Sequence, residues 1–364
     1  MIAIEPLSHG GGAIPLGQAG QFKLSSQGSA PPPENIQLHV RSNGILHVSP
    51  LFRWSSWQQA SQPFSFFPES PGTHSLHASW PAPDGSRGHA ELAVEVRGAA
   101  PPTGGPELAK APSRTRLWAP SAWEARALRS HENDVLALLP EYVKPGSVVY
   151  DIGANLGLYS IVCGRLTGAA GRVYAFEANP VCLYFLRANL STAGITWSEI
   201  LAVAVAGANE LLEFTINYDN LNLGLGSNSV FFAHKAGHRI QLASRDLDGL
   251  VEEFRLRPPD VIKMDIEGGE VAAVRGMPKV LRDVRPVMLM ELHGQGPARD
   301  TLAILDGHGY RYLDIASRRD YATGADLVAQ MPNAPVQVVA LPSGRRPWPR
   351  PRPRRRRTQR PSRP

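Results

Sequence analysis

The chain is poor in cysteine and has no long apolar run. Its 364 residues include two cysteines, Cys163 and Cys182, too few for a disulfide framework. Both fall in segments with helical apolar spacing, so we expect buried free thiols and a reducing, cytoplasmic location. No stretch approaches the roughly 18 apolar residues that a membrane helix needs. The first residues, MIAIEPLSHGGG, show no secretory signal. We therefore expect no membrane partner.

The last twenty residues contain no acidic side chain. They hold ten arginines, so the formal net charge of +6 for the whole chain leaves −4 for the rest. Such a segment cannot bury a core, and we expect residues 343–364 to form a disordered Arg/Pro-rich tail. A basic arm that binds nucleic acid is the alternative for this tail.

Short alternating segments dominate the beginning of the chain. Around Asn43-Gly44 and again around Pro83-Asp84-Gly85, alternating strands flank a tight turn. This pattern predicts a small all-β sandwich of the immunoglobulin type over residues 1–97. Such a domain could contact a protein or a glycan. Residues 98–115 are rich in Pro, Gly and Ala and predict a linker.

Residues 116–342 are predicted to form a second domain, of the α/β class. A helix is expected over Trp118–Leu139, and strands and helices alternate after it, which is typical of a doubly wound, mostly parallel sheet. The expected strands are Val148–Asp151, Arg172–Glu177, Glu199–Ala206, Glu213–Ile216, Val261–Asp265 and Pro286–Leu292, with a closing pair at Gly307–Ile315 and Val336–Leu341.

The run SVVYDIGANLGLYS predicts a ligand site at the end of the first parallel strand. Asp151 ends that strand, and the loop that follows contains Gly153, Ala154, Asn155 and Gly157. Ligands of open α/β sheets bind at the carboxyl ends of strands. The loop lacks the third glycine of a dinucleotide fingerprint. It suits a ligand without pyrophosphate, such as S-adenosylmethionine, whose ammonium group would face the acid.

A second acid lies at the tip of the next strand, in YAFEANP. Glu177 follows Gly157 by 20 residues, a spacing at which a carboxylate accepts the ribose hydroxyls of an adenosyl ligand. With its neighbours Ala178 and Asn179, it completes the expected cofactor site.

Two further segments place acids and a histidine at the same edge. DVIKMDIEGGE ends a buried strand at Asp265, with Glu267 in the loop and Glu270 at the start of a helix, and VMLMELHG carries Glu291 and His293. Strands one and four are neighbours in a doubly wound sheet, so Asp151 and Asp265 should border one cleft. His293 at its mouth is a candidate general base.

Together these segments resemble the FkbM-type methyltransferases, a branch of the class I S-adenosylmethionine-dependent enzymes. DIGANLGLYS, YAFEANP, SRDLDGLV, IKMDIEGGE and MELHG stand in the family's order over roughly Ser130–Ala340. The resemblance implies methyl transfer to a hydroxyl of a sugar or polyketide-like acceptor, with His293 as base and Asp265 second. In SRDLDGLV, Asp248 should cap its helix.

Several alternatives remain open at this stage. Some related enzymes hold a magnesium ion, for which Asp265, Glu267 and Glu291 offer oxygen ligands, but we expect no metal. A fold without turnover, serving as a scaffold or binding module, is one alternative function. A nucleic-acid methyltransferase guided by the tail is another, although the Pro-Pro pair of base methylases follows Arg257 here instead of Asn or Asp. The Asn/Gly-rich segment Asn217–Val230 predicts a mobile loop near the acceptor.

Overall fold

We analysed a computed structural model of the chain. It describes residues 2–6, 14–15, 20–26, 35–42, 45–53, 61–66, 72–81, 87–97, 107–110, 115–119, 133–216, 238–332 and 335–344. Residues 345–364 of the expected Arg/Pro tail and the Asn217–Val230 segment lie outside these ranges. Ser343, at the expected start of the tail, is described, and its N–H donates to Gly309 O at 2.8 Å. Among the described residues, none of the helices combines the length and the apolar character that crossing a bilayer would need.

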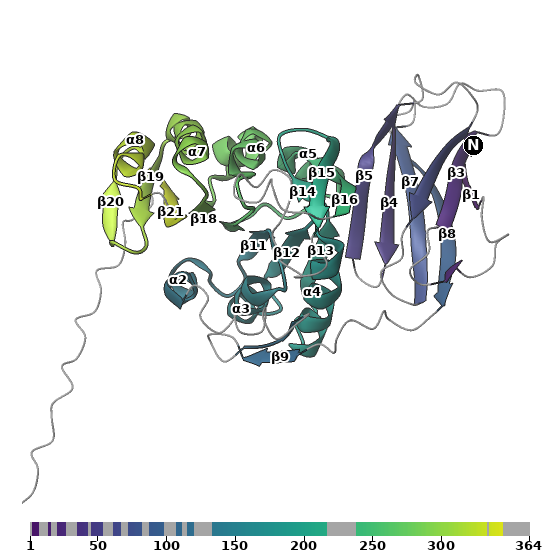
Figure 1. Cartoon of the computed structure of the whole chain (residues 1–364), viewed down its shortest axis with the longest axis horizontal. Coiled ribbons are helices and arrows are strands. Elements are labelled where there is room, and N and C mark those ends of the chain that lie inside the picture. Colours follow the sequence, from purple (N-terminus) through teal and green to yellow (C-terminus); the bar gives the residue numbers. More distant parts are fainter. Residues whose placement is uncertain are drawn as a thin grey trace, which may run out of the picture.

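The larger part of the fold is a mostly parallel sheet (Figure 1). Its strand order is β13-β12-β11-β17-β18-β21-β19-β20, and the pairs from β13 to β18 are parallel. The remaining pairs described in this part, β18–β21, β21–β19 and β19–β20, are antiparallel. The strands are β11 (Val148–Ile152), β12 (Arg172–Glu177), β13 (Ser198–Ala202), β17 (Val261–Met264), β18 (Val287–Leu292), β19 (Tyr310–Asp314), β20 (Arg319–Tyr321) and β21 (Val336–Pro342). The α/β expectation and its closing pair are confirmed.

Helices cover both faces of this sheet because its central strands are apolar on both sides. Val149 packs into a core with α2, α3 and α4, and Tyr150, the next residue, packs into a core with α5 to α8. These helices are α2 (Asn133–Tyr142), α3 (Leu158–Thr167), α4 (Pro180–Thr192), α5 (Leu247–Glu253), α6 (Glu270–Arg275), α7 (Gln295–Gly307) and α8 (Gly324–Val328). Continuous burial of this kind is typical of parallel strands, and all five residues of β11 are buried.

The described strands of the first 97 residues form two sheets, and the assignment of this region to a sandwich domain stays a prediction. One sheet is β1-β3-β6, and the other runs β2-β8-β7-β4-β5. Both predicted hairpins are present, with Ser42 paired to Ile45 and Pro81 paired to Arg87. The strands are β1 (Ile2–Pro6), β2 (Ile14–Pro15), β3 (Gly20–Ser26), β4 (Asn35–Ser42), β5 (Ile45–Arg53), β6 (Ser61–Phe66), β7 (Gly72–Pro81) and β8 (Arg87–Arg97).

The two parts are joined through their sheets, which the sequence did not predict. Strand β5 pairs in parallel with β13, with Ile45 opposite Ile200 and His47 opposite Ala202. The second N-terminal sheet and the α/β sheet thereby form one continuous sheet of 13 strands (Figure 1). Backbone hydrogen bonds, in addition to the connecting chain, hold the β-rich region against the α/β region.

The segment expected to be linker and early helix is different in the structure. Strands β9 (Glu107–Lys110) and β10 (Arg116–Ala119) pair as an antiparallel ribbon, and the described helix α2 begins only at Asn133. The predicted helical start at Trp118 is therefore wrong. Leu117 is fully buried, and the backbone N–H and C=O of Trp118 are both bonded by the Asn189 side chain of α4. These tertiary contacts favour an extended backbone here.

A small third sheet, β14-β16-β15, lies above the edge at β13. It consists of β14 (Ala204–Val205), β15 (Glu210–Ile216) and β16 (His238–Arg245). The expected third strand thus ends early, at Ala202, and the chain turns into this sheet.

The expectation for Asp248 was wrong. Helix α5 is capped by Asp246, whose Oδ1 accepts a hydrogen bond from the Gly249 N–H at 2.6 Å. The Asp248 carboxylate accepts from the N–H groups of Lys279 and Val280, at 2.7 and 3.0 Å, at the start of the π-helix η4 (Val280–Val284). It caps a distant helix.

Candidate active site

The loop between β11 and α3 needs glycine at two positions. Gly153 has a φ of 79°, and a Cβ built there would lie 2.0 Å from the backbone O of Asp265. Gly157 has a φ of 92°, and its Cβ would meet Leu186 Cδ1 at 2.7 Å. The loop also folds back onto β12, since the N–H groups of Gly153 and Ala154 both donate to Phe176 O at 3.0 Å. The glycine loop therefore lies directly against the Asp265 segment.

We expect Gly153→Ala to destabilise the fold strongly. The left-handed conformation alone costs an L-residue roughly 1–2 kcal/mol, and the overlap with the Asp265 carbonyl adds to it. Gly146→Ala is a matched control, because Gly146 has a similar φ of 85° and open space around the added Cβ. Denaturant midpoints of both variants would separate strain from overlap. Equal losses of unfolding free energy would contradict the close approach.

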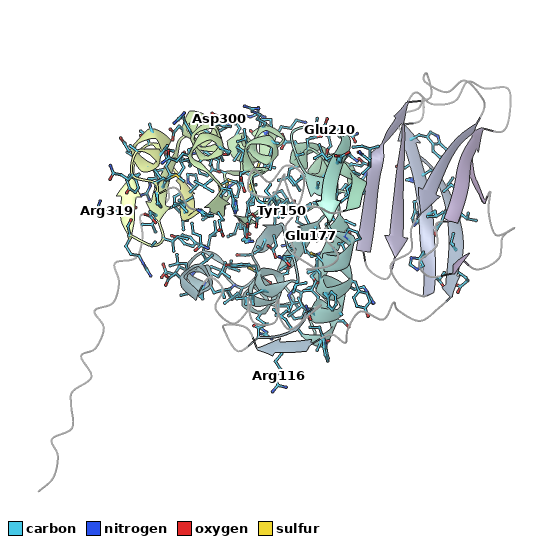
Figure 2. All side chains as sticks on the ribbon, in the orientation of Figure 1. Arg116, Tyr150, Glu177, Glu210, Asp300 and Arg319 are labelled. Atoms are coloured by element: carbon cyan, nitrogen blue, oxygen red, sulfur yellow. The ribbon has the colours of Figure 1, made fainter. Side chains whose placement is uncertain are left out.

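Glu177 binds the glycine loop to the tip of β12 (Figure 2). Its Oε2 accepts from the Asn155 N–H and its Oε1 from the Asn179 N–H, each at 2.7 Å. Burial raises the pKa of Glu177, while the backbone N–H groups of Asn179, Asn155 and Ala178 oppose that rise. A carboxylate has about four acceptor sites. With three backbone donors, about one acceptor site stays open for another donor, such as a ribose hydroxyl.

Asp151 is more enclosed than the sequence suggested. It is fully buried, and its Oδ2 accepts from Ser160 Oγ at 2.6 Å. Oδ1 has no hydrogen-bond partner among the described residues. Burial raises the pKa of Asp151, and the ammonium of Lys263, opposite it in the register of β17, works against this rise. The carboxylate lies beneath the glycine loop with one oxygen still to be satisfied.

Lys263 connects Asp151 to the next acid. Its Nζ lies 3.3 Å from Asp265 Oδ2 and 4.5 Å from the centre of the Tyr159 ring. A buried ammonium needs such partners, because transfer from water is costly without them. Lys263 is therefore an ion-pair partner of Asp265 at the end of β17.

His293 lies at the centre of a carboxylate cluster. Its Nδ1 is 3.0 Å from Glu270 Oε1, and its Nε2 is 3.4 Å from Glu267, 3.8 Å from Glu291 and 3.9 Å from Asp265. The imidazole is only 3% exposed. Burial alone would lower its pKa, but the hydrogen bond and charge of Glu270, with the charges of Glu267 and Asp265, raise the pKa of His293 to about 9.

Glu267 is the most strongly perturbed acid beside this histidine. Burial raises the pKa of Glu267 to about 7; His293 opposes the rise, and Asp265 and Glu270 add to it. Its backbone is left-handed, with a φ of 53°, which is uncommon for a residue other than glycine. A perturbed acid beside a buried histidine at a sheet edge is a candidate functional group.

A small pocket opens next to the cluster, between β17, β18, β21 and α2. Lys263, Glu291 and Gln337 are its polar lining residues, and the remaining lining is apolar. Gln337 Nε2 donates to Glu291 Oε2 at 3.2 Å. With a volume of about 10 Å³, this hollow has room for about one water molecule and is far smaller than a small-molecule site.

The structure thus brings together the candidates that the sequence placed on separate strands. The glycine loop contacts Glu177 on one side and the Asp265 segment on the other, and His293 lies beyond Asp265. Sequence reasoning missed Ser160 and Tyr159, and it treated Glu270 as a helix-end charge. Glu270 does begin α6, but its carboxylate accepts from the Gly268 N–H and bonds His293. The spacing IEGGE gave no indication of this second contact.

Known methyltransferases resemble part of this chain. Residues 151–312 match the family described as the methyltransferase FkbM domain. The hexuronic acid methyltransferase AglP of Haloferax volcanii is 28% identical over 185 residues, which cover 50% of this chain and 71% of that protein. The ribosomal protein L11 methyltransferase of Carboxydothermus hydrogenoformans is 40% identical over 57 residues, 16% of this chain and 18% of that protein.

Solved structures show weaker likeness. The methyltransferase FkbM of Methylobacillus flagellatus, 16% identical, covers 60% of this chain and 55% of its own with a TM-score of 0.33. A methyltransferase of Streptococcus mutans in complex with SAH, 11% identical, covers 57% and 94% with the same TM-score. The family match in sequence, over the residues that form the glycine loop and the carboxylate cluster, is the stronger finding. Residues 151–312, which carry the glycine loop and the carboxylate cluster, are similar to the methyltransferase FkbM domain.

Proposed function

We propose that the chain transfers the methyl group of S-adenosylmethionine to a hydroxyl oxygen of a small-molecule or glycan acceptor. The observation that carries this proposal is the contact between two chemically different groups at one sheet edge. A glycine loop with Glu177 suits an adenosyl ligand, and it touches the Asp265 segment next to His293.

The cofactor would lie along the loop of Gly153, Ala154, Asn155 and Gly157. Glu177, with the flanking Ala178 and Asn179, would hold the ribose hydroxyls by charge-assisted hydrogen bonds. The unsatisfied Oδ1 of Asp151 would accept a donor from the amino-acid end of the cofactor, directly or through a water. The carboxylates nearby favour a positively charged sulfonium.

The reaction would be an in-line displacement. The acceptor oxygen forms a bond to the methyl carbon, the sulfur–methyl bond breaks, and the sulfur leaves as a neutral thioether. Much of the rate would come from holding the two reactants in line. The acceptor's proton must leave as the bond forms, and His293 and Asp265 are the proposed catalytic residues for that step. Because the raised pKa of His293 keeps a proton on it at neutral pH, His293 can act as the base only after that proton has left Nε2, where Glu267 lies 3.4 Å away.

The acceptor class rests on a relative: AglP is described as a hexuronic acid methyltransferase. The polar side chains of Glu291 and Gln337, which bond each other at 3.2 Å beside the cluster, are the groups that could hydrogen-bond a polyhydroxylated acceptor. We propose a sugar-type acceptor on these grounds. The buried free cysteines agree with the proposed cytoplasmic location.

Two measurements test the proposal. Calorimetric titration with S-adenosylhomocysteine should show one site per chain, whereas the absence of binding would favour an inactive scaffold. Incubation with methyl-labelled cofactor and sets of uronic acids, neutral sugars and simple alcohols should then label a hydroxyl of a sugar. Label found in nucleic acid or protein, with the sugars unlabelled, would overturn the acceptor assignment.

A further inference from the structure

One imidazole in this structure faces four carboxylates. Glu270 lies on its Nδ1 side, and Glu267, Glu291 and Asp265 lie 3.4 to 3.9 Å from its Nε2. Lys263 adds one more cation at Asp265. Two cations for four acids leave an excess of negative charge in a largely buried place. Buried charges of one sign require a compensating partner.

We propose that Asp265, Glu267 and His293 form a binding site for a divalent transition-metal ion. One ligand atom from each residue lies within 4.8 Å of the other two. Ligands bound at about 2.0–2.2 Å from one ion lie roughly 3–4 Å from each other, depending on the coordination angle. The Nε2 distances of 3.4 Å to Glu267 and 3.9 Å to Asp265 already fall in that range.

The surroundings of His293 orient it as a ligand. Nδ1 lies 3.0 Å from Oε1 of Glu270, a carboxylate that is 1% exposed, and the same oxygen accepts from the Gly268 N–H at 3.1 Å. With the Nδ1 side held by Glu270, Nε2 faces Asp265 and Glu267. A carboxylate behind a ligating histidine fixes its tautomer and increases its basicity, and such partners are typical of metal sites. Glu270 Oε2 is buried without a hydrogen-bond partner among the described residues.

The donor set selects the kind of ion. Magnesium and calcium prefer oxygen ligands throughout, whereas imidazole together with carboxylates suits manganese, iron or zinc. Three protein ligands leave coordination positions open. The ion's part in the reaction rests on the proposed function: an acceptor hydroxyl bound to the ion would lose its proton more easily. His293 would then act as a ligand and not as the base.

Manganese is a suitable probe because the spectrum of the free ion is lost on binding. The full-length protein would be stripped with a chelator, exchanged into clean buffer and titrated with MnCl2 while free Mn²⁺ is measured by electron paramagnetic resonance. We expect one ion bound per chain. Asp265→Asn and His293→Gln should each weaken binding by at least about tenfold. Asp283→Asn removes an exposed carboxylate paired with Arg282 and should change nothing.

Three outcomes would overturn the site: no Mn²⁺ bound by the wild-type chain, binding unchanged in both cluster variants, or binding weakened equally by Asp283→Asn. Thermal melting and S-adenosylhomocysteine titration of each variant show whether it is folded. These measurements test the ion site and the methyl-transfer function independently. If the chelator-stripped protein binds no Mn²⁺ but still transfers methyl groups, the ion site is rejected and the proposed function stands, with His293 as the base. If the protein binds Mn²⁺ but transfers no methyl group, the ion site stands and the proposed function is rejected.

Discussion

His293→Ala should reduce methyl transfer by about 10²–10⁴-fold, the usual contribution of a positioned acid–base group. Without the imidazole, only the surrounding carboxylates, such as Asp265, could accept the acceptor's proton. If His293 instead binds a metal ion, His293→Ala should reduce methyl transfer in the same way, because the ion would lose a ligand. The affinity for S-adenosylhomocysteine should change by no more than about threefold, because Glu177 lies on the other side of the site. A threefold change in Kd corresponds to about 0.6 kcal/mol of binding free energy.

The measurement is single-turnover methyl transfer with labelled cofactor, together with calorimetry for binding. His293→Ala also leaves Glu270 buried without its partner, which would destabilise the fold. His293→Gln is therefore a second variant, since its amide can still donate to Glu270 Oε1. His89→Ala, which changes an exposed histidine on β8, is the control. Wild-type turnover in both His293 variants would remove this residue from the chemistry.

Glu177→Ala should weaken cofactor binding by about 1–3 kcal/mol, the cost of losing a hydrogen-bonding charge. The variant removes the ribose acceptor and also leaves the Asn155 and Asn179 N–H groups without their carboxylate. Glu177→Gln should be nearly as harmful. A glutamine has one carbonyl oxygen, so its NH₂ group would face one of these two backbone donors.

Calorimetric titration of S-adenosylhomocysteine into both variants gives the binding free energies directly. Glu210→Ala, an exposed glutamate on β15, is the matched control. Because the loop itself depends on Glu177, thermal melting should accompany each titration. Affinity unchanged in both Glu177 variants would contradict the assignment of this edge to an adenosyl ligand.

Much of this architecture was readable from local sequence. Strands β11, β12, β17 and β18 were predicted to within a residue because each is a short apolar run that ends in turn or helix residues. The candidates at their carboxyl ends followed from topology alone. The order of parallel strands places Asp151 beside the Asp265 segment whatever the details of packing.

The features that the sequence did not predict depend on contacts between residues far apart in the chain. Trp118 looks helical locally, yet Asn189, 71 residues later, binds its backbone as part of a ribbon. Asp248 stands two residues after the N-cap of α5, yet its carboxylate bonds η4, more than 30 residues away. From the sequence, Glu267 is only an acid in a glycine-rich loop. Its approach to His293 depends on its own left-handed φ and on the start of α6, and the sequence IEGGE predicts neither.

The pairing of β5 with β13 has a consequence for any attempt to isolate the methyltransferase region. Removal of the first 97 residues would expose one side of β13 as a row of unpaired backbone donors and acceptors, which is a template for association with another chain. The N-terminal strands thus act as a protective cover for the open end of the α/β sheet. A shortened protein would need a substitute for that cover to remain monomeric.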